Sequence, residues 1–347
     1  MQRIGTLLTS LAAALFLAVG LLAAPAPASA ADINLTYANF PPASTFPCVQ
    51  MERWAQAVAE RTGGKVAVQT FPGGTLLGAK NMFRGVQSGQ ADIGCLCMSY
   101  QPGVFPVTTA TDLPLGFSSS LVASMTLWDL YQKYQPAEFA DVKVLTMFAS
   151  APSNIMSKTP VKSLADLKGL ELRASGTPSK VLKALGATPV SMPMSQAPEA
   201  LQKGVVQGLL SSLEVLKDFN FAESCRYETI IDGPVYPFAV VMNKARWEGL
   251  PDDVKAVLDK LGEEQAEWTG RYMDQHVQES LAWSKERYGI EVHKLSKAEM
   301  QEVARLTQPL ITKWETAAAE AGLPAQKIIE DVVGMKAENL ATYSGTE

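Results

Sequence analysis

The sequence SLADLKGLELRASGTP, residues 163–178, decides the fold class. Its first four residues have the spacing of a capping box before a short helix, and residues 170–175 follow as a strand. Thr177 and Pro178 provide an N-cap and a first-turn proline for a second helix, which Gly186 ends. A strand between two helical segments is the repeating unit of an α/β protein.

The same order of elements recurs along the chain. Alternation and helical periodicity predict strands at 33–38, 65–71 and 91–98, a helix at 48–61 and a short helix near 82–86. After a helical stretch at 121–134, strands are predicted at 142–149, 154–158 and 187–193, and two extended runs lie within 228–244. Two successive β/α units predict two lobes.

Helices dominate the last part of the chain. Apart from Gly262 and Gly270, residues 251–288 contain no strong helix breaker, so they are predicted to form one long helix or two stacked ones. Residues 290–295 alternate as a short strand, and Ser296 begins a second capping-box match before the closing helical region.

The first thirty residues have the pattern of an export signal. They carry one charge, Arg3, before a long apolar run, and they end in small residues up to Ala30. This pattern predicts a signal peptide, residues 1–30, cleaved after about Ala30, and an uncleaved membrane anchor is the alternative. We therefore expect a protein that is exported to the periplasm, without direct membrane insertion after cleavage.

Composition indicates a packed globular protein. The hydrophobic share is 47%, and the formal net charge of −5 becomes −6 without Arg3. An acidic chain lacks the basic surface that nucleic acid requires. The four cysteines, Cys48, Cys95, Cys97 and Cys225, allow three disulfide pairings, and the sequence does not choose among them. Buried thiols or one disulfide fit better than a metal site, because no histidine accompanies the cysteines.

Motifs of enzymes and cofactor sites are missing from the sequence. Residues 73–80 resemble a phosphate loop, but Asn81 stands where a metal-binding hydroxyl is required. Neither His276 nor His293 lies beside a plausible nucleophile, and carboxylates on helices are expected to be solvated. We expect no enzymatic activity, no metal site and no cofactor.

Several segments together resemble a known family. They are RTGGKV at 61–66, FPGGTLLG at 71–78, VQSGQADIG at 86–94, the stretch at 163–176, and ALQKGVVQG at 200–208. In this order and spacing the chain is similar to the DctP-type substrate-binding subunits of tripartite ATP-independent periplasmic (TRAP) transporters. The resemblance covers nearly all of the chain after residue 30.

This resemblance implies a two-lobe periplasmic binding protein, a flytrap with crossing strands and long C-terminal helices. Lobe I would contain residues 31–150 plus about 238–272, and lobe II about 151–237 plus about 273–347. The lobes would close on a small organic anion and deliver it to the small and large TRAP membrane subunits, which use an ion gradient for uptake. A subunit that senses the ligand for a signalling receptor, or a secreted enzyme, is the alternative.

Arg173 is the first candidate ligand contact. It lies near the carboxyl end of a predicted strand, before Ser175 and the next helix. A planar guanidinium can hold a carboxylate through two parallel hydrogen bonds, and the helix start adds unpaired backbone N–H groups. Arg173 also matches the anion-clamping arginine that the resemblance implies. A surface ion pair is the alternative role.

Two departures from the family pattern concern the ligand. A second arginine about 20 residues before the first is common in the family, whereas this chain has neutral residues there, among them Ser153 and Asn154. The family's asparagine after the Val-Asp-Gly equivalent is also missing, and the chain continues to Ser211 and Ser212. These differences predict a ligand with one anionic group, a carboxylate or a small sulfonate, and an apolar or aromatic body.

Aromatic and methionine side chains from the predicted rim loops complete the candidate site. With Ser211 and Ser212, the wall residues that we predict are Phe40, Phe46, Met98, Tyr100, Tyr236 and Phe238. Each aromatic residue has a second possible role as ordinary lobe core.

Overall fold

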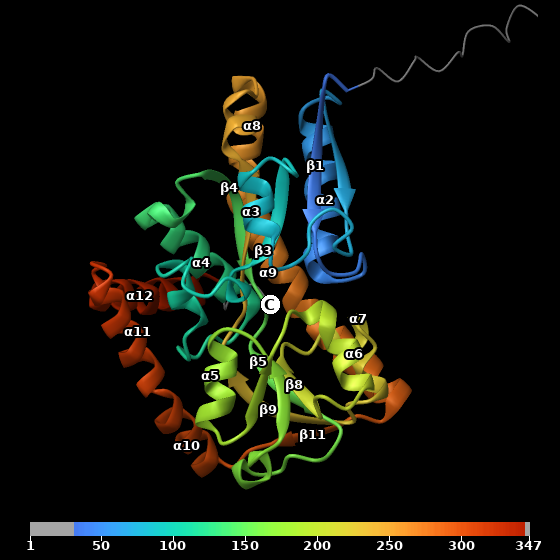
Figure 1. Ribbon diagram of the computed structural model, residues 1–347, viewed down its shortest axis with the longest axis vertical. Helices are drawn as coiled ribbons and strands as arrows, with labels where there is room; N and C mark the ends of the chain where they lie inside the picture. The colour runs from blue at the N-terminus through green and yellow to red at the C-terminus, as the bar shows by residue number, and fades with distance from the viewer. Residues whose placement is uncertain (1–30, 344–347) are drawn as a thin grey trace, which may run out of the picture.

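The computed structural model describes residues 31–343, which form two β-sheets, one above the other in Figure 1. The first sheet has the strand order β2-β1-β3-β10-β4, and the second has β11-β9-β5-β8-β6-β7. We call the parts built on these sheets lobe I and lobe II. The predicted α/β class is confirmed, and the predicted signal peptide, residues 1–30, lies outside the described residues.

Lobe I begins with alternating strands and helices, as the periodicity predicts. Strands β1, β2 and β3 are parallel, and β10 runs antiparallel between β3 and β4. The strands are β1 (Ile33–Asn39), β2 (Val66–Phe71), β3 (Ile93–Cys97), β4 (Val142–Ala149) and β10 (Pro237–Asn243), and the helices are α2 (Phe46–Arg61), α3 (Met82–Gln87), α4 (Ser120–Tyr134) and α8 (Lys244–Glu248).

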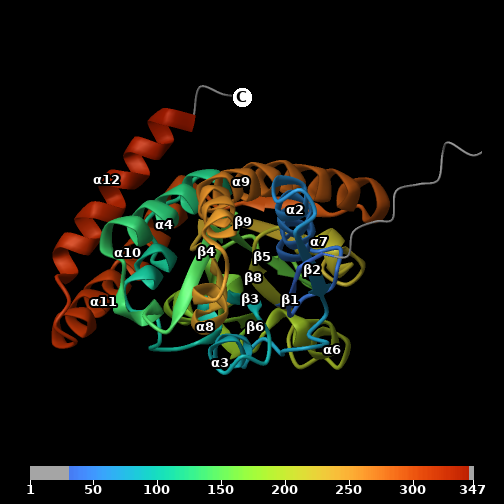
Figure 2. The same cartoon turned by 90° about the horizontal axis from the view of Figure 1, so that it is seen from above.

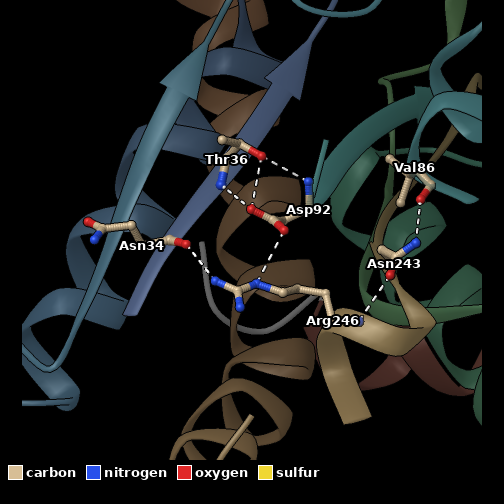
Figure 3. Close-up of polar contacts among 6 residues, drawn as sticks. All are labelled: Asn34, Thr36, Val86, Asp92, Asn243 and Arg246. Atoms are coloured by element: carbon tan, nitrogen blue, oxygen red, sulfur yellow. Dashed lines mark hydrogen bonds and ion pairs between the residues drawn. The ribbon is translucent and has the colours of Figure 1, made fainter. Parts of the chain in front are cut away.

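A partly buried carboxylate joins three segments of lobe I that are distant in sequence (Figure 3). Asp92, just before β3, accepts hydrogen bonds from the backbone N and Oγ1 of Thr36 in β1, at 2.8 and 3.0 Å. Arg246 of α8 forms an ion pair with Asp92 at 3.2 Å and donates to the carbonyl of Asn34 at 2.7 Å. The returning chain after β10 is therefore fixed to the N-terminal strands.

Lobe II contains the stretch that opened the sequence analysis. Its strands are β5 (Ser153–Ser157), β6 (Glu171–Ala174), β7 (Thr188–Ser191), β8 (Gly208–Ser211), β9 (Tyr227–Gly233) and β11 (Glu291–Lys294), and its helices include α5 (Thr177–Ala184), α6 (Ala197–Gln202) and α7 (Val215–Asp218). Both capping boxes, at Ser163 and Ser296, are present. The predicted N-cap of α5 is wrong, because Gly176 with φ of 61° is the cap and Thr177 is the first helical residue.

Two crossing segments connect the lobes and are hydrogen-bonded to each other. Residues 149–153 lead from β4 to β5, and residues 233–237 lead back from β9 to β10. Ser150 donates its N–H to the carbonyl of Tyr236 at 2.9 Å, and Tyr236 donates its N–H to Oγ of Ser150 at 2.9 Å. The crossing strands expected from the family resemblance are therefore present.

The long predicted helix is one continuous element, α9 (Asp252–Tyr288). Figure 2 shows it passing along α4, α2 and α7, which it contacts. Gly262 and Gly270 permit close packing, because an added Cβ at Gly270 would lie 2.5 Å from the Cα of Leu121 in α4. These glycines do not break the helix because neighbouring elements pack directly on them.

The C-terminal helices are α10 (Lys297–Thr307), α11 (Pro309–Glu320) and α12 (Ala325–Tyr343). Helix α12 packs on α4 of lobe I, where Asn339 donates to Asp129 at 2.8 Å and Tyr134 donates to Asp331 at 2.8 Å. The predicted division into lobe I, residues 31–150 with 238–272, and lobe II, residues 151–237 with 273–347, stays a prediction. Its segment 273–347 assigns α12 to lobe II, although this helix packs on α4 of lobe I.

Cys48, Cys95, Cys97 and Cys225 are all free and buried, so buried thiols are the correct alternative for these cysteines. Between residues 31 and 343, no helix has both the length and the apolar character needed to cross a bilayer.

Candidate functional site

Arg173 lies between the two lobes, where β6 ends. Its side chain is only 1% exposed. Nε donates to the carbonyl of Met192 at 3.0 Å, and Nη2 donates to the hydroxyl oxygen of Tyr100 at 3.1 Å. Ser175 donates to the same Met192 carbonyl at 2.8 Å, so the loop after β7 fixes the direction of the arginine.

The rings of Tyr100 and Tyr236 both lie near the Arg173 guanidinium. Each ring centroid is 5.9 Å from Cζ of Arg173. Burial raises the pKa of Tyr100 and of Tyr236, so both phenols are neutral at pH 7. The tyrosines therefore contact the cation without neutralising its charge.

No carboxylate within residues 31–343 forms an ion pair with Arg173. Nη1 of Arg173 also has no hydrogen-bond partner among these residues. A buried charge without its partner is unfavourable by several kcal/mol, roughly, so folded proteins rarely contain one without a function. The arrangement suits an anion that enters from outside the chain.

A cavity extends from Arg173 between the lobes. It contains about 450 Å³ of space not filled by atoms, including the part open to solvent. The residues that line it come from the loop after β1, from both crossing segments, from Tyr100, and from the segment between β8 and α7. They are Phe40, Pro41, Thr45, Phe46, Pro47, Tyr100, Ser150, Arg173, Met194, Ser211, Ser212, Glu214, Val215, Asp218, Phe219, Tyr236 and Phe238.

The cavity wall is rich in packed aromatic rings. Phe46 meets Phe238 edge to face at a centroid distance of 5.4 Å, and Phe40 meets Tyr100 in the same way at 5.6 Å. Behind them, Phe148 stacks on Phe238 at 5.4 Å. Such contacts fix the rings and leave a rigid apolar surface for the body of a ligand.

Two carboxylates line the cavity together with this apolar surface. Glu214 is 2% exposed, and the side chain of Asp218 is 4% exposed. Burial, with repulsion from Asp218, raises the pKa of Glu214 to about 8, so Glu214 carries a proton at pH 7. Asp218 Oδ1 lies 2.7 Å from Nε2 of His276 in α9, and this hydrogen bond raises the pKa of His276.

The lobes touch each other at one edge of the site. An added Cβ on Gly176 would lie 2.7 Å from Cβ of Ser99, so only glycine fits this close approach. Thr177 donates to Asp112 at 2.6 Å, and Ser99 donates to the same carboxylate at 3.3 Å. Burial raises the pKa of Asp112 to about 6. Because Ser99 and Asp112 belong to lobe I and Thr177 belongs to lobe II, these contacts join the two lobes.

The structure brings eight of the twelve predicted site residues to the cavity. They are Phe40, Phe46, Tyr100, Arg173, Ser211, Ser212, Tyr236 and Phe238.

The other four predicted residues do not line the cavity. Ser153 donates to the carbonyl of Pro234 at 2.5 Å, and Asn154 accepts from the N–H groups of Ile231 and Asp232, so both stabilise the irregular pairing of β5 with β9. Met98 is 1% exposed and packs in the core. Ser175 supports the site through Met192 rather than by facing the cavity.

The prediction missed several lining residues, of which Glu214 and Asp218 matter most. The rule that helix carboxylates are solvated is wrong for this pair. The one available signal was their position shortly after Ser211 and Ser212, which were already predicted wall residues.

Comparison with known proteins decides the family. A model of the DctP family, described as bacterial extracellular solute-binding protein, family 7, matches residues 37–317. The chain belongs to this family. A TRAP periplasmic solute-binding protein from Desulfovibrio salexigens is 63% identical; the match covers 91% of this chain and 98% of that one, with a TM-score of 0.81. Its structure is an open complex with the C-terminus of a symmetry mate in the ligand-binding site.

Two more distant DctP-like relatives have named ligands. A marine-metagenome TRAP solute-binding protein, described as specific for aromatic acid ligands and solved with metahydroxyphenylacetate, is 28% identical. The match covers 88% of this chain and 99% of that one, with a TM-score of 0.85. The 2,3-diketo-L-gulonate-binding periplasmic protein YiaO of Escherichia coli is 27% identical over 249 residues, which cover 70% of this chain and 76% of YiaO.

Proposed function

We propose that the protein captures a small monocarboxylate with an apolar or aromatic body between its lobes. It then delivers this ligand to the membrane subunits of a TRAP transporter, which take it up with an ion gradient. The family is a transport family, and this supports a binding role without catalysis. The ligand carboxylate pairs with Arg173, and the aromatic wall contacts the body.

The observation that carries this proposal is the unpaired charge of Arg173. A guanidinium that is 1% exposed has lost nearly all contact with water. Arg173 donates its two hydrogen bonds to neutral acceptors, the Met192 carbonyl and the Tyr100 hydroxyl, so they leave the positive charge uncompensated. A bound carboxylate supplies the compensating charge and accepts the remaining N–H groups.

The cavity favours one carboxylate over two. Arg173 is the one cationic side chain among the described residues that line it. Glu214 and Asp218 line the same cavity as Arg173. A second carboxylate of the ligand would lie near these acids and would have no cationic partner. The aromatic surface suits a body such as the one in the metagenomic relative's ligand.

A ligand screen tests the proposal. The compound that co-purifies is identified by mass spectrometry after denaturation, and a thermal-shift panel then compares aromatic and branched monocarboxylates with succinate. We expect the monocarboxylates to raise the melting temperature most, because they match one cation and an apolar wall. If succinate gives the largest increase, the proposed ligand class is wrong.

A further inference from the structure

The cavity has a second polar end, which the anion at Arg173 does not use. Oε2 of Glu214, Oδ2 of Asp218 and Oγ of Ser212 are buried without a hydrogen-bond partner among the described residues. All three residues line the cavity. Because buried polar atoms are nearly always hydrogen-bonded, three unpartnered atoms in one wall point to a group that arrives with the ligand.

The local fold explains why these atoms meet. Strand β8 ends at Ser211, the chain turns, and Glu214 precedes α7, which places Asp218 one helical turn further on. Helix α9 supports the arrangement from behind, because His276 holds Oδ1 of Asp218 at 2.7 Å. Oδ2 is therefore the oxygen of Asp218 that remains available.

This end is separate from the anion site. No ion pair joins Arg173 to Glu214 or Asp218, although all three residues line the cavity. A ligand that fills the cavity thus meets a cation in one region and carboxyl oxygens in another.

We propose that Glu214 and Asp218 accept a hydrogen bond from a donor group, a hydroxyl or an ammonium, on the body of the carboxylate that Arg173 holds. This inference rests on the proposed function and narrows its ligand class. The cavity then selects hydroxy acids or amino acids over purely apolar acids, because a ligand donor satisfies Oδ2 of Asp218 and the carbonyl oxygen of protonated Glu214.

Matched probe acids test the inference. The aromatic set is meta-hydroxyphenylacetate, meta-(aminomethyl)phenylacetate and meta-methylphenylacetate, and the aliphatic set is gamma-hydroxybutyrate, gamma-aminobutyrate and pentanoate. Within each set the members differ mainly in the terminal group. In the set that fits the cavity, we expect calorimetry to show a donor-bearing member binding at least about tenfold more tightly than its methyl counterpart.

Variants identify the residue responsible. Glu214→Leu removes the carboxyl oxygens of Glu214 and leaves only Oδ2 of Asp218 as an acceptor, so it should reduce the preference for the donor to less than about threefold. Glu214→Gln keeps a carbonyl acceptor and nearly the same shape, so it should retain a hydroxyl preference and lose an ammonium preference. Glu248→Gln, on the exposed end of α8, is the control and should change neither. Circular dichroism melts check that each variant is folded.

The outcomes separate the two proposals. If the methyl member binds as tightly as its donor counterparts, or if Glu214→Leu keeps the preference, the inference is wrong while the proposed function stands. If no acid of either set and no monocarboxylate of the thermal-shift panel binds, the proposed function fails and this inference fails with it. Calorimetry in buffers of different ionisation enthalpy measures proton release on binding and distinguishes a hydroxyl from an ammonium donor. An ammonium requires the ionised form of Glu214, so its binding should release a proton, whereas binding of a hydroxyl should not.

Discussion

Replacing Arg173 gives the most direct test of the anion site. The guanidinium is 1% exposed and has no carboxylate partner between residues 31 and 343, so its contact with a ligand acid is desolvated. Truncating one partner of a desolvated charge pair weakens binding by about 2–5 kcal/mol. We expect Arg173→Ala to lower ligand affinity by a factor between about 30 and about 5,000.

The lysine variant separates geometry from charge. Arg173→Lys keeps the positive charge but loses the planar fork, and its single nitrogen cannot reproduce both the Nε bond to Met192 and the Nη2 bond to Tyr100. We therefore expect Arg173→Lys to lose a sizeable part of the affinity that Arg173→Ala loses. Both variants should fold, because Tyr100 keeps its hydrogen bond from the backbone N–H of Met194 at 3.1 Å.

Isothermal titration with the co-purified ligand measures these effects. Arg84→Ala, which removes an exposed arginine of α3, is the matched control and should bind like the unmodified protein. A surface ion pair at Arg173 would contribute about 1 kcal/mol or less, and to stability rather than affinity. Nearly unchanged affinity of Arg173→Ala would refute the role assigned to this residue.

Three other predictions concern stability and cofactors. Burial raises the pKa of Glu228 to about 7, so the folded state binds this proton more tightly than the unfolded state and stability falls as pH rises from about 4.5 to 7. Glu228→Gln should therefore raise the melting temperature at about pH 8 and not at about pH 4; equal melts at pH 8 would contradict this. Gly270→Ala should lower the melting temperature, because its Cβ would meet the backbone of Leu121. Gly334→Ala, in open space on α12, should raise stability by about 0.5–1 kcal/mol. The reverse order of the two variants in thermal melts would argue against this packing. Ligand binding and the accompanying decrease in radius of gyration, followed by calorimetry and scattering, should survive EDTA, and their loss would reveal a metal.

Periodic segments were the predictable part of the fold. The buried stripe of Met51, Trp54 and Val58 gave α2 to within two residues, since one helical face carries nearly all its apolar side chains. Strand β8 was missed because its four residues are all buried and show no alternation. The cap of α5 was displaced by one residue because Gly176 meets Ser99 of the other lobe, a contact that sequence spacing does not report.

The candidate site was predictable where residue type alone implies a role. Arg173 is such a residue, because a guanidinium at the end of a strand has few functions other than binding anions or forming ion pairs. Glu214 and Asp218 could not be distinguished from solvated helix carboxylates, since their burial depends on α9, which crosses behind them from a distant part of the chain. Ser153 and Asn154 were misplaced because the local irregularity of β5 turns them toward β9.

The four buried cysteines have a practical consequence for experiments on lobe movement. Burial raises the pKa of the thiols of Cys48, Cys97 and Cys225 to about 12, and that of Cys95 is also raised. Maleimides and disulfide reagents attack the thiolate, and at neutral pH these side chains hold almost none. A single cysteine introduced on the surface of each lobe would therefore be the preferred target for fluorescent dyes, without prior removal of the native cysteines.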